Sequence, residues 1–575
     1  MNLLKNIFID KSNNFSLGLS ENSRNIIANI LITHSFILYV LSIYNTKITT
    51  ISYYLDFGLL EVLPNTFPLA IILLVVSILI NIEKMSELKY IALLILLSDY
   101  IWGIRVFVES YAFAHDAWGM GYIAKEIFDS GNFSFADQIK PAMYYIGWPG
   151  AFIFLVSLVH ITGIQIIDII KIYPIIISPI QIFSVYALFR TFSRNQSRYA
   201  ALFFLVVNNF IYIHWSPQSI SMIIFIALLL LMKKIEKSTH SLIANSLIFI
   251  TVSSIIVIHP TMSLILIIFL ICLIIIMISK TYIKNVHFDT VLPLDFLIRL
   301  TVLSIVLFII WNYYMSNYNF NSLTKQTFPN LANILTAEKT TSFAIQRATS
   351  LAIATKIRAW FFLFSGLITI GFLSYTFFKN KRIKTYEYCF LMTSIGFYLL
   401  DINLTKGAYF ERIFMIAYLA ISSIFGMIYI KFKEKKHLLK YTFISFLLIT
   451  FTFYDHDILD LYSESVINGY GFALSNGYGK SAAISADTYT IAEPFLLLNH
   501  TLFLGENARF KDINISIPIQ NYYIISDSNA VKWNFNTKGQ INQYNDFFSK
   551  ISNNFSKVYE NPAIIIYLNQ HYSDS

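Results

Sequence analysis

The sequence predicts an all-α polytopic membrane bundle of about 13 transmembrane helices, followed by a small external C-terminal domain of α/β or β type. Composition is the first reason: of 575 residues, 56% are hydrophobic and only 13% are charged, with a mean hydropathy of +0.60. A soluble chain carries about 25% charged residues, so this one must be surrounded by lipid. The other reasons are the repeated apolar stretches in residues 1–455 and the polar composition of residues 456–575.

Fourteen apolar stretches approach the length of about 20 residues that crosses roughly 30 Å of hydrocarbon. They are 25–44, 67–82, 89–107, 142–162, 172–189, 199–214, 218–232, 241–258, 261–279, 298–314, 359–378, 386–402, 408–430 and 439–454. Several are short and need polar flanks to reach both interfaces. We expect Trp148-Pro149-Gly150 to break or kink the fourth stretch.

Lysines and arginines gather between these stretches, where they set the topology. The basic clusters are Lys5/Lys11/Arg24, Lys84/Lys89, Arg190/Arg194/Arg198, Lys233/Lys234/Lys237, Lys280/Lys284, Lys379/Lys381/Arg382/Lys384 and Lys431 through Lys440. Placing them all in the cytoplasm needs an even number of spans between neighbours, yet three stretches separate Lys89 from Arg190. We therefore expect one of 142–162 or 172–189 to be re-entrant or interfacial, which leaves thirteen true spans. The alternative places Arg190–Arg198 outside.

Residues 456–575 differ in composition from residues 1–455, being rich in Asn, Ser, Asp and Gly. The runs YYIIS at 522–526 and AIIIYL at 563–568 are typical of strands. We therefore expect a membrane domain, 1–455, and a soluble domain, 456–575. The lysine pattern puts the N-terminus in the cytoplasm and this soluble domain outside. It also puts outside the loops 45–66, 108–141 and 315–358. The sequons at Asn499, Asn514 and Asn554 agree with an external face.

Two further features exclude other classes of protein. The net charge of +9 comes from 42 Lys and Arg against 33 Asp and Glu, but these lysines lie between apolar runs, so no nucleic-acid partner is expected. Cys272 and Cys389 lie inside apolar stretches without disulfide or metal-ligand spacing. We expect both to be small packed residues and predict no metal-ligating residues.

A first group of ionisable residues follows the third stretch, in RVFVESYAFAHDAW (105–118). If the helix continued, Glu109 and Asp116, seven residues apart, would share one face, and His115 and Trp118 flank the aspartate. An acidic residue at the mouth of a membrane cavity suits a general base for a hydroxyl nucleophile. The alternative is that these charges only cap a helix at the level of the lipid headgroups.

A second group lies around the start of the stretch 408–430. Arg412 is just inside the predicted outer end of that span, with Lys406 nearby. A guanidinium at this place can bind a phosphate with two parallel hydrogen bonds. The alternatives are snorkelling of Arg412 to the interface and a salt bridge with Glu411 or Asp401.

Each of three other polar positions allows two hypotheses about its role. Asp99, near the centre of the third stretch, either pairs with a neighbouring helix or belongs to a proton relay. His259, followed by Pro260, lies at a predicted external turn, where it punctuates the turn or faces a substrate. The external turn 208–219, which contains His214, suits either a sugar ring or the aromatic belt at the interface.

The layout resembles the GT-C membrane glycosyltransferases. The patterns that carry the resemblance are SYAFAHDAWGMGYIAKEIFDSGNF (110–133), YYIGWPGAFIFLVSLVHITGI (144–164) and FERIFMIAYLAIS (410–422). The tail SKVYENPAIIIYLN (556–569) is similar to the ending of uncharacterised archaeal members. The WWDYG signature of oligosaccharyltransferases is absent from the sequence, which argues against that subgroup.

The resemblance implies a division of roles. An acidic residue in the first large external loop activates the acceptor or coordinates a metal ion, which maps to Asp116, with Glu109 and His115 beside it. A late arginine engages the donor phosphate, which maps to Arg412. This chain departs from the pattern, because His115-Asp116 replaces the usual acidic pair and the loop follows the third span, so an extra N-terminal hairpin is required. The candidate donor-phosphate contacts besides Arg412 are Lys406, Arg347 and Arg358, and the alternative for the charges of loop 315–358 is that they are ordinary solvated loop charges. The candidate cavity residues are Trp118, Tyr144, Trp148, His214 and His259.

The function implied is transfer of a sugar from a polyprenyl-phosphate-linked donor to a lipid, glycan or protein acceptor on the outer face of the cell membrane. The resemblance allows a divalent metal ion and requires none. A transporter or flippase of lipid-linked or small polar substrates is the alternative, with Asp99 and Arg105 lining a path, although we find no second copy of a half-repeat. A structural or assembly protein would keep the topology without the chemistry.

Overall fold

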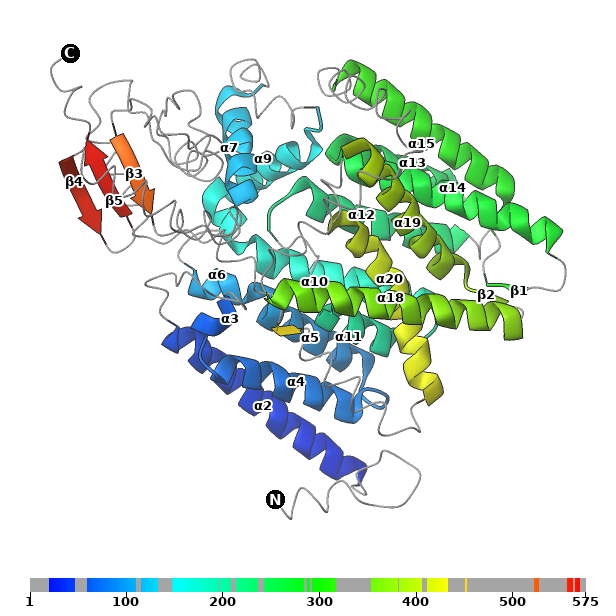
Figure 1. Ribbon diagram of the computed structural model, residues 1–575, viewed down its shortest axis with the longest axis horizontal. Coiled ribbons are helices and arrows are strands. Elements are labelled where there is room, and N and C mark those ends of the chain that lie inside the picture. The colour runs from blue at the N-terminus through cyan, green and yellow to red at the C-terminus, as the bar shows by residue number, and fades with distance from the viewer. Residues whose placement is uncertain are drawn as a thin grey trace.

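The computed structural model shows a mostly helical, polytopic membrane protein (Figure 1). The residues that it describes are 20–46, 59–109, 115–132, 147–194, 196–207, 214–235, 242–283, 287–289, 292–316, 353–380, 382–405, 411–432, 450–451, 522–526, 556–561 and 564–568. Long helices packed against one another form the bulk of this part of the chain.

The helices follow the predicted apolar stretches closely. In chain order they are α2 (Glu21–Asn45), α3 (Leu59–Val62), α4 (Thr66–Asn81), α5 (Glu87–Ser98), a π-helical turn η1 (Asp99–Gly103), α6 (Ile104–Val108), α7 (His115–Ser130), α9 (Gly150–Thr162), α10 (Ile166–Phe192), α11 (Ser197–Val207), α12 (Pro217–Ile235), α13 (Leu242–Ile258), α14 (Pro260–Tyr282), α15 (Leu294–Tyr314), α18 (Ile353–Asn380), α19 (Thr385–Thr405) and α20 (Glu411–Phe432). Only the last stretch, 439–454, lies mostly outside the described residues.

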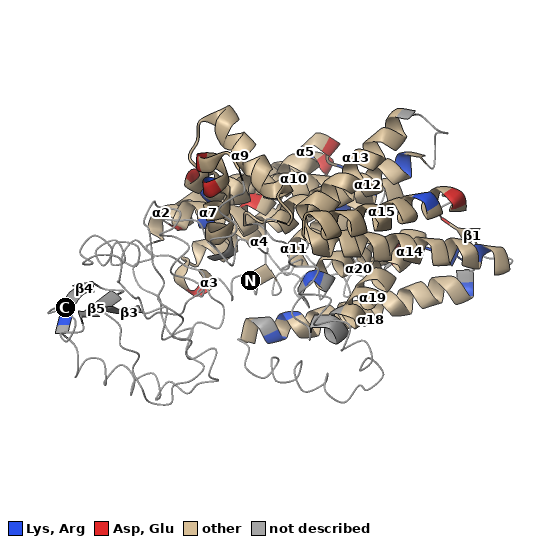
Figure 2. Ribbon diagram, turned by 90° about the horizontal axis from the view of Figure 1, so that it is seen from above, with Lys and Arg blue, Asp and Glu red and all other residues tan. Residues whose placement is uncertain are grey.

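Eight helices of the described part are long and apolar enough to cross a membrane. They are Glu21–Asn45, Glu87–Val108, Ile166–Phe192, Pro217–Ile235, Pro260–Tyr282, Leu294–Tyr314, Lys356–Lys379 and Phe414–Lys431. Four shorter apolar helices accompany them, at Thr66–Asn81, Gly150–Thr162, Ser197–Val207 and Ile243–Ile258. Figure 2 shows that charged residues are few along these helices. The count of about 13 spans stays a prediction.

The first two long helices, α2 and α4, form an antiparallel hairpin. The Ser35 hydroxyl donates to the Ala70 carbonyl at 2.7 Å, and the Ser77 hydroxyl donates to the Ala28 carbonyl at 3.0 Å. Tyr39 of α2 stacks on Tyr100 of η1, with ring centroids 3.9 Å apart. A hairpin thus precedes the third stretch; that it is additional to the GT-C layout stays a prediction.

The helix α5–η1–α6 runs antiparallel to α10. The Ser178 hydroxyl of α10 donates to Asp99 Oδ1 at 3.4 Å, and the two helices approach closely at Gly103, where a Cβ would lie 2.8 Å from Ile175 Cγ2. Asp99 is thus paired with a neighbouring helix, which is the first of the two hypotheses for this residue. The end of α6 and the start of α10 lie at the same end of the bundle.

Helices α7 and α9 fill the connection between α6 and α10. Phe128 of α7 and His160 of α9 are in ring contact at 4.7 Å. Because the chain leaves and re-enters at the same end, α7 and α9 together make no net crossing. The 13 residues of α9 reach only about 20 Å at ~1.5 Å per residue, less than the roughly 30 Å of a bilayer core. α9 begins at Gly150, within the predicted break, and which of 142–162 or 172–189 fails to span stays a prediction.

Basic residues from loops far apart in the sequence meet at the other end of the bundle. The contacts are Lys84 with Glu21, Arg190 with Glu87, the Arg198 guanidinium with the Ile82 carbonyl, and Lys233 with the Tyr386 ring. The cluster Arg190/Arg194/Arg198 thus lies on the same side as Lys84 and Lys89. This arrangement is consistent with all the basic clusters lying on one side of the membrane. It is not consistent with Arg190–Arg198 lying on the side opposite Lys84 and Lys89.

Short strands complete the fold. β1 (His287–Phe288) pairs in parallel with β2 (Arg382–Ile383), and Asp289 accepts hydrogen bonds from Arg382 and Lys384, each at 2.7 Å. β3 (Tyr522–Ser526), β4 (Ser556–Asn561) and β5 (Ile564–Leu568) form an antiparallel sheet in the order β3-β5-β4. The two predicted strand runs are confirmed, and the external domain 456–575 stays a prediction. Cys272 and Cys389 are buried and free, as expected.

Candidate functional site

The start of α20 is joined to the start of α14. Arg412, the second residue of α20, donates from Nη1 to the hydroxyl of Thr261 in the first turn of α14, 151 residues earlier in the sequence. Thr261 is buried, whereas Arg412 is partly exposed. The guanidinium therefore lies at the N-terminus of a long helix, where the macrodipole adds partial positive charge.

His259 caps the same helix. Its Nδ1 accepts a hydrogen bond from the Met262 backbone N–H at 3.3 Å, and its carbonyl accepts one from the Ser263 hydroxyl at 2.9 Å. The sequence His-Pro-Thr produces this cap, because Pro260 stands at a helical position that has no N–H partner to lose. Arg412 contacts Thr261, two residues after His259. The turn thus places an imidazole and a guanidinium at the same helix start.

The Trp148-Pro149-Gly150 turn packs against this cluster. A Cβ at Gly150 would lie 2.8 Å from Ile258 Cγ1, so only glycine permits the approach to the end of α13. The Trp311 indole N–H of α15 donates to the Gly147 carbonyl at 2.8 Å. Trp148 itself is buried. The predicted cavity residues Trp148 and His259 therefore lie in neighbouring turns.

The start of α7 belongs to the same region. Trp118 is fully buried in one apolar cluster with Phe152 of α9, Trp215 before α12 and Ile258 before the His259 cap. Asp116 precedes Ala117 in the first turn of α7. The side chains of His115 and Asp116 lie outside the described residues, so their catalytic roles stay predictions.

Arg358 lies in α18, near the same end of the bundle. Phe362, one turn further along α18, contacts Phe414 at 4.2 Å and Tyr418 at 5.5 Å between ring centroids. Near the other ends of the two helices, Lys431 of α20 lies over the Tyr375 ring at 4.4 Å, so α18 and α20 run parallel. Arg358 is buried and interacts electrostatically with Tyr418. The starts of α18 and α20, which carry Arg358 and Arg412, therefore face the same side.

Glu109 does not share a helical face with Asp116. The helix ends at Val108, Glu109 has extended backbone angles (φ −96°, ψ 138°), and α7 begins only at His115. One continuous helix from Glu109 to Asp116, which a shared face would require, is therefore not present. Glu109 is buried at the end of α6.

The remaining predicted site residues are placed only in part. His214 lies, partly buried, just before α12. Lys406, Arg347 and Tyr144 lie outside the described residues. Sequence reasoning missed Thr261, although the His-Pro-Thr helix start signals it. No group of three or more His, Cys, Asp or Glu that could hold a metal ion occurs in the described part of the chain.

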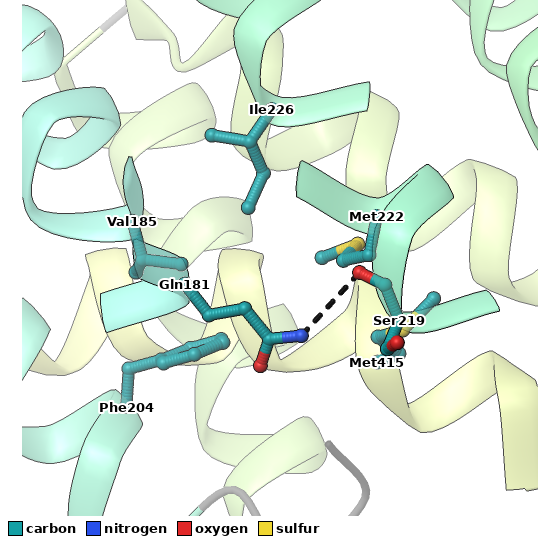
Figure 3. A pocket seen from close by; sticks show the side chains of 7 residues that line it. All are labelled: Gln181, Val185, Phe204, Ser219, Met222, Ile226 and Met415. Atoms are coloured by element: carbon teal, nitrogen blue, oxygen red, sulfur yellow. Dashed lines mark hydrogen bonds between the residues drawn. The ribbon is translucent and has the colours of Figure 1, made fainter. Parts of the chain in front are cut away.

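A small cavity lies one turn below Arg412, between α10, α11, α12 and α20 (Figure 3). Its volume is about 10 Å³, and Gln181, Val185, Phe204, Ser219, Met222, Ile226 and Met415 line it. The Gln181 side-chain amide donates to the Ser219 carbonyl at 3.5 Å, which links α10 to α12 across it. A cavity of this size holds about one water, so it is not the place for a sugar. We interpret it as packing beneath the site.

The cluster of Arg412, His259 and Thr261, under α7 and α9, has the chemistry of an anion site. A guanidinium, a helix N-terminus and a ring N–H are all hydrogen-bond donors or positive dipoles. It lies at the end opposite the basic clusters, since Arg412 and Lys431 stand at opposite ends of α20. A phosphate is the ligand that such a set of donors prefers.

Comparisons with known proteins give structural neighbours only. No family model matches the chain, and no curated protein matches it. The chain is similar to the Archaeoglobus fulgidus oligosaccharyltransferase tethered with an acceptor peptide, at 12% identity and TM-score 0.45, over 76% of this chain and 61% of that one. It is also similar to ArnT from Cupriavidus metallidurans bound to undecaprenyl phosphate, at 10% identity and TM-score 0.35, over 85% and 99% of the two chains.

Both neighbours are GT-C membrane glycosyltransferases, the class that the sequence resembles. This chain spans about three fifths (61%) of the length of the oligosaccharyltransferase chain. A similarity at these TM-scores does not define an activity, so function is argued from the residues of this chain.

Proposed function

We propose that this protein is a membrane glycosyltransferase that moves a sugar from a polyprenyl-phosphate-linked donor to an acceptor on the outer face of the cell membrane. The observation that supports it best is the attachment of Arg412 to the start of α14, at the end of the bundle opposite the basic clusters. By the positive-inside rule that end is external. A lipid phosphate at headgroup depth would meet Arg412 there.

The transfer needs a base and a cation. Asp116 takes the proton of the acceptor hydroxyl, whose oxygen attacks the anomeric carbon of the sugar. The bond from that carbon to the phosphate oxygen breaks, and the phosphate leaves with the electron pair. Arg412 stabilises the charge that develops on the leaving phosphate. Because a phosphate leaves readily, no general acid is needed.

The metal option has no support from the described carboxylates. Asp99 is paired with Ser178 within a span, and Glu109 is buried at the end of α6. If a divalent ion is used, Asp116 is the residue that would hold it. The ion would then supply charge at the phosphate or the acceptor oxygen.

Sealed proteoliposomes loaded with a fluorescent polyprenyl-phosphate hexose test the proposal. A transferase releases polyprenyl phosphate when acceptor glycans or peptides are supplied on one side. A transporter or flippase moves the intact lipid-linked sugar across the bilayer without releasing phosphate. Movement without release, across several acceptor classes, would contradict the transferase proposal.

A further inference from the structure

The imidazole of His259 is held in one tautomer by the helix that it caps. Its Nδ1 lies 3.3 Å from the backbone nitrogen of Met262. A backbone N–H can only donate, so Nδ1 must supply its lone pair. The ring proton of the neutral imidazole is therefore on Nε2.

The surroundings favour this neutral form. Protonation of Nδ1 would break the cap and place a second positive charge beside Arg412 and the N-terminus of α14. His259 is consequently a fixed hydrogen-bond donor through Nε2. It has no lone pair left with which to act as a base.

The Nε2–H group has no hydrogen-bond partner within the described part of the chain, and His259 is partly buried. The five-membered ring directs Nε2 away from the nitrogen of Met262 that Nδ1 engages. A donor of fixed orientation, next to the guanidinium of Arg412, needs an acceptor oxygen from a ligand. A phosphate presents several such oxygens.

We propose that His259 binds the phosphate of the lipid donor through Nε2–H, beside Arg412, while its Nδ1 keeps the start of α14 in place. The inference rests on the proposed function and adds a second phosphate contact to the site. It makes His259 a binding residue that transfers no proton.

Two substitutions separate the two nitrogens. His259→Asn keeps an acceptor that caps α14, because Asn is among the best N-cap residues, but its side chain ends before the position of Nε2. His259→Gln places an amide N–H near the position of Nε2 but caps the helix less well. The first should keep thermal stability and lose phosphate binding, and the second should lose stability and keep part of the binding.

The probe is undecaprenyl phosphate, with undecaprenol as its uncharged control, bound to the purified full chain in nanodiscs of zwitterionic lipid. We expect His259→Asn to weaken the binding of undecaprenyl phosphate by about 10- to 150-fold, because one hydrogen bond to a charged group is lost, and to leave the binding of undecaprenol unchanged. Equal binding of undecaprenyl phosphate by wild type and His259→Asn would overturn the inference.

Further measurements distinguish a failure of this inference from a failure of the proposed function. If wild type shows no preference for undecaprenyl phosphate over undecaprenol, the proposed donor is wrong and the inference falls with it. If the preference exists and Arg412→Lys weakens it while His259→Asn does not, only the inference is wrong. Competition by inorganic phosphate or by phosphatidylglycerol at the affinity of undecaprenyl phosphate would mean a general anion site and would also overturn it.

Discussion

Replacing Arg412 with lysine keeps the charge at the start of α20 and removes the planar fork. In the structure the fork already donates to Thr261, so a lysine must choose between Thr261 and the phosphate. The loss is at least one charge-assisted hydrogen bond, about 1.5–3 kcal/mol. At about 1.4 kcal/mol per factor of ten, donor use should fall roughly 10- to 150-fold.

The measurement is the rate of polyprenyl phosphate release at varied donor concentration, together with the melting temperature. Because Arg412 is partly exposed, stability should fall by only about 1 kcal/mol, the worth of a typical hydrogen bond. Arg190→Lys is the matched control, because it alters an arginine that pairs with Glu87 at the opposite end. Normal donor use by Arg412→Lys would show that Arg412 is only an interface anchor.

Three other predictions follow from the site and the topology. Asp116→Asn should slow turnover by about 10²–10⁴-fold with little change in donor affinity, whereas Glu109→Gln, after the break in the helix, should not; the reverse ranking of purified variants would exchange their roles. Asp289 is buried enough to raise the pKa of its carboxyl, but hydrogen bonds from Lys384 and Arg382 lower that pKa below its usual range overall. Its stabilisation is therefore present above about pH 4, the unfolded pKa, and is lost as pH falls further. Asp289→Asn should lower the melting temperature at pH 7, and the gap to wild type should narrow at acid pH; an equal gap throughout would refute this. A cysteine placed at Ser528 should react with an impermeant label in intact cells, and one placed at Lys435 should not, because the basic loop is predicted to be cytoplasmic; the opposite pattern would invert the active face.

The helices were predictable because their cause is local. An apolar stretch in lipid must satisfy its own backbone, so each stretch of sufficient length becomes a helix. The strands at 522–526 and 564–568 follow likewise from β-branched and aromatic runs. The lysine pattern also predicted that either 142–162 or 172–189 does not span, because the positive-inside rule needs an even number of spans between basic clusters on the same side.

Parity along the sequence did not say which helices pair. The contacts of Ser178 with Asp99 and of Arg190 with Glu87 make α10 the antiparallel partner of α5–α6. In the same way, the apolar pattern did not indicate that the helix ends at Val108 and that Glu109 has extended backbone angles.

The sequence by itself determined a membrane bundle, the distribution of its basic residues and the candidates His259 and Arg412, since each depends on composition or on neighbours along the chain. Only the tertiary structure decided that Arg412 reaches Thr261, 151 residues earlier in the sequence, at the helix start that His259 caps. The start of α14 and the start of α20 meet because both helices pack with α19, and side-chain shape sets that packing. Hydrophobicity specifies that helices associate, but the fit of their surfaces specifies which ends come together.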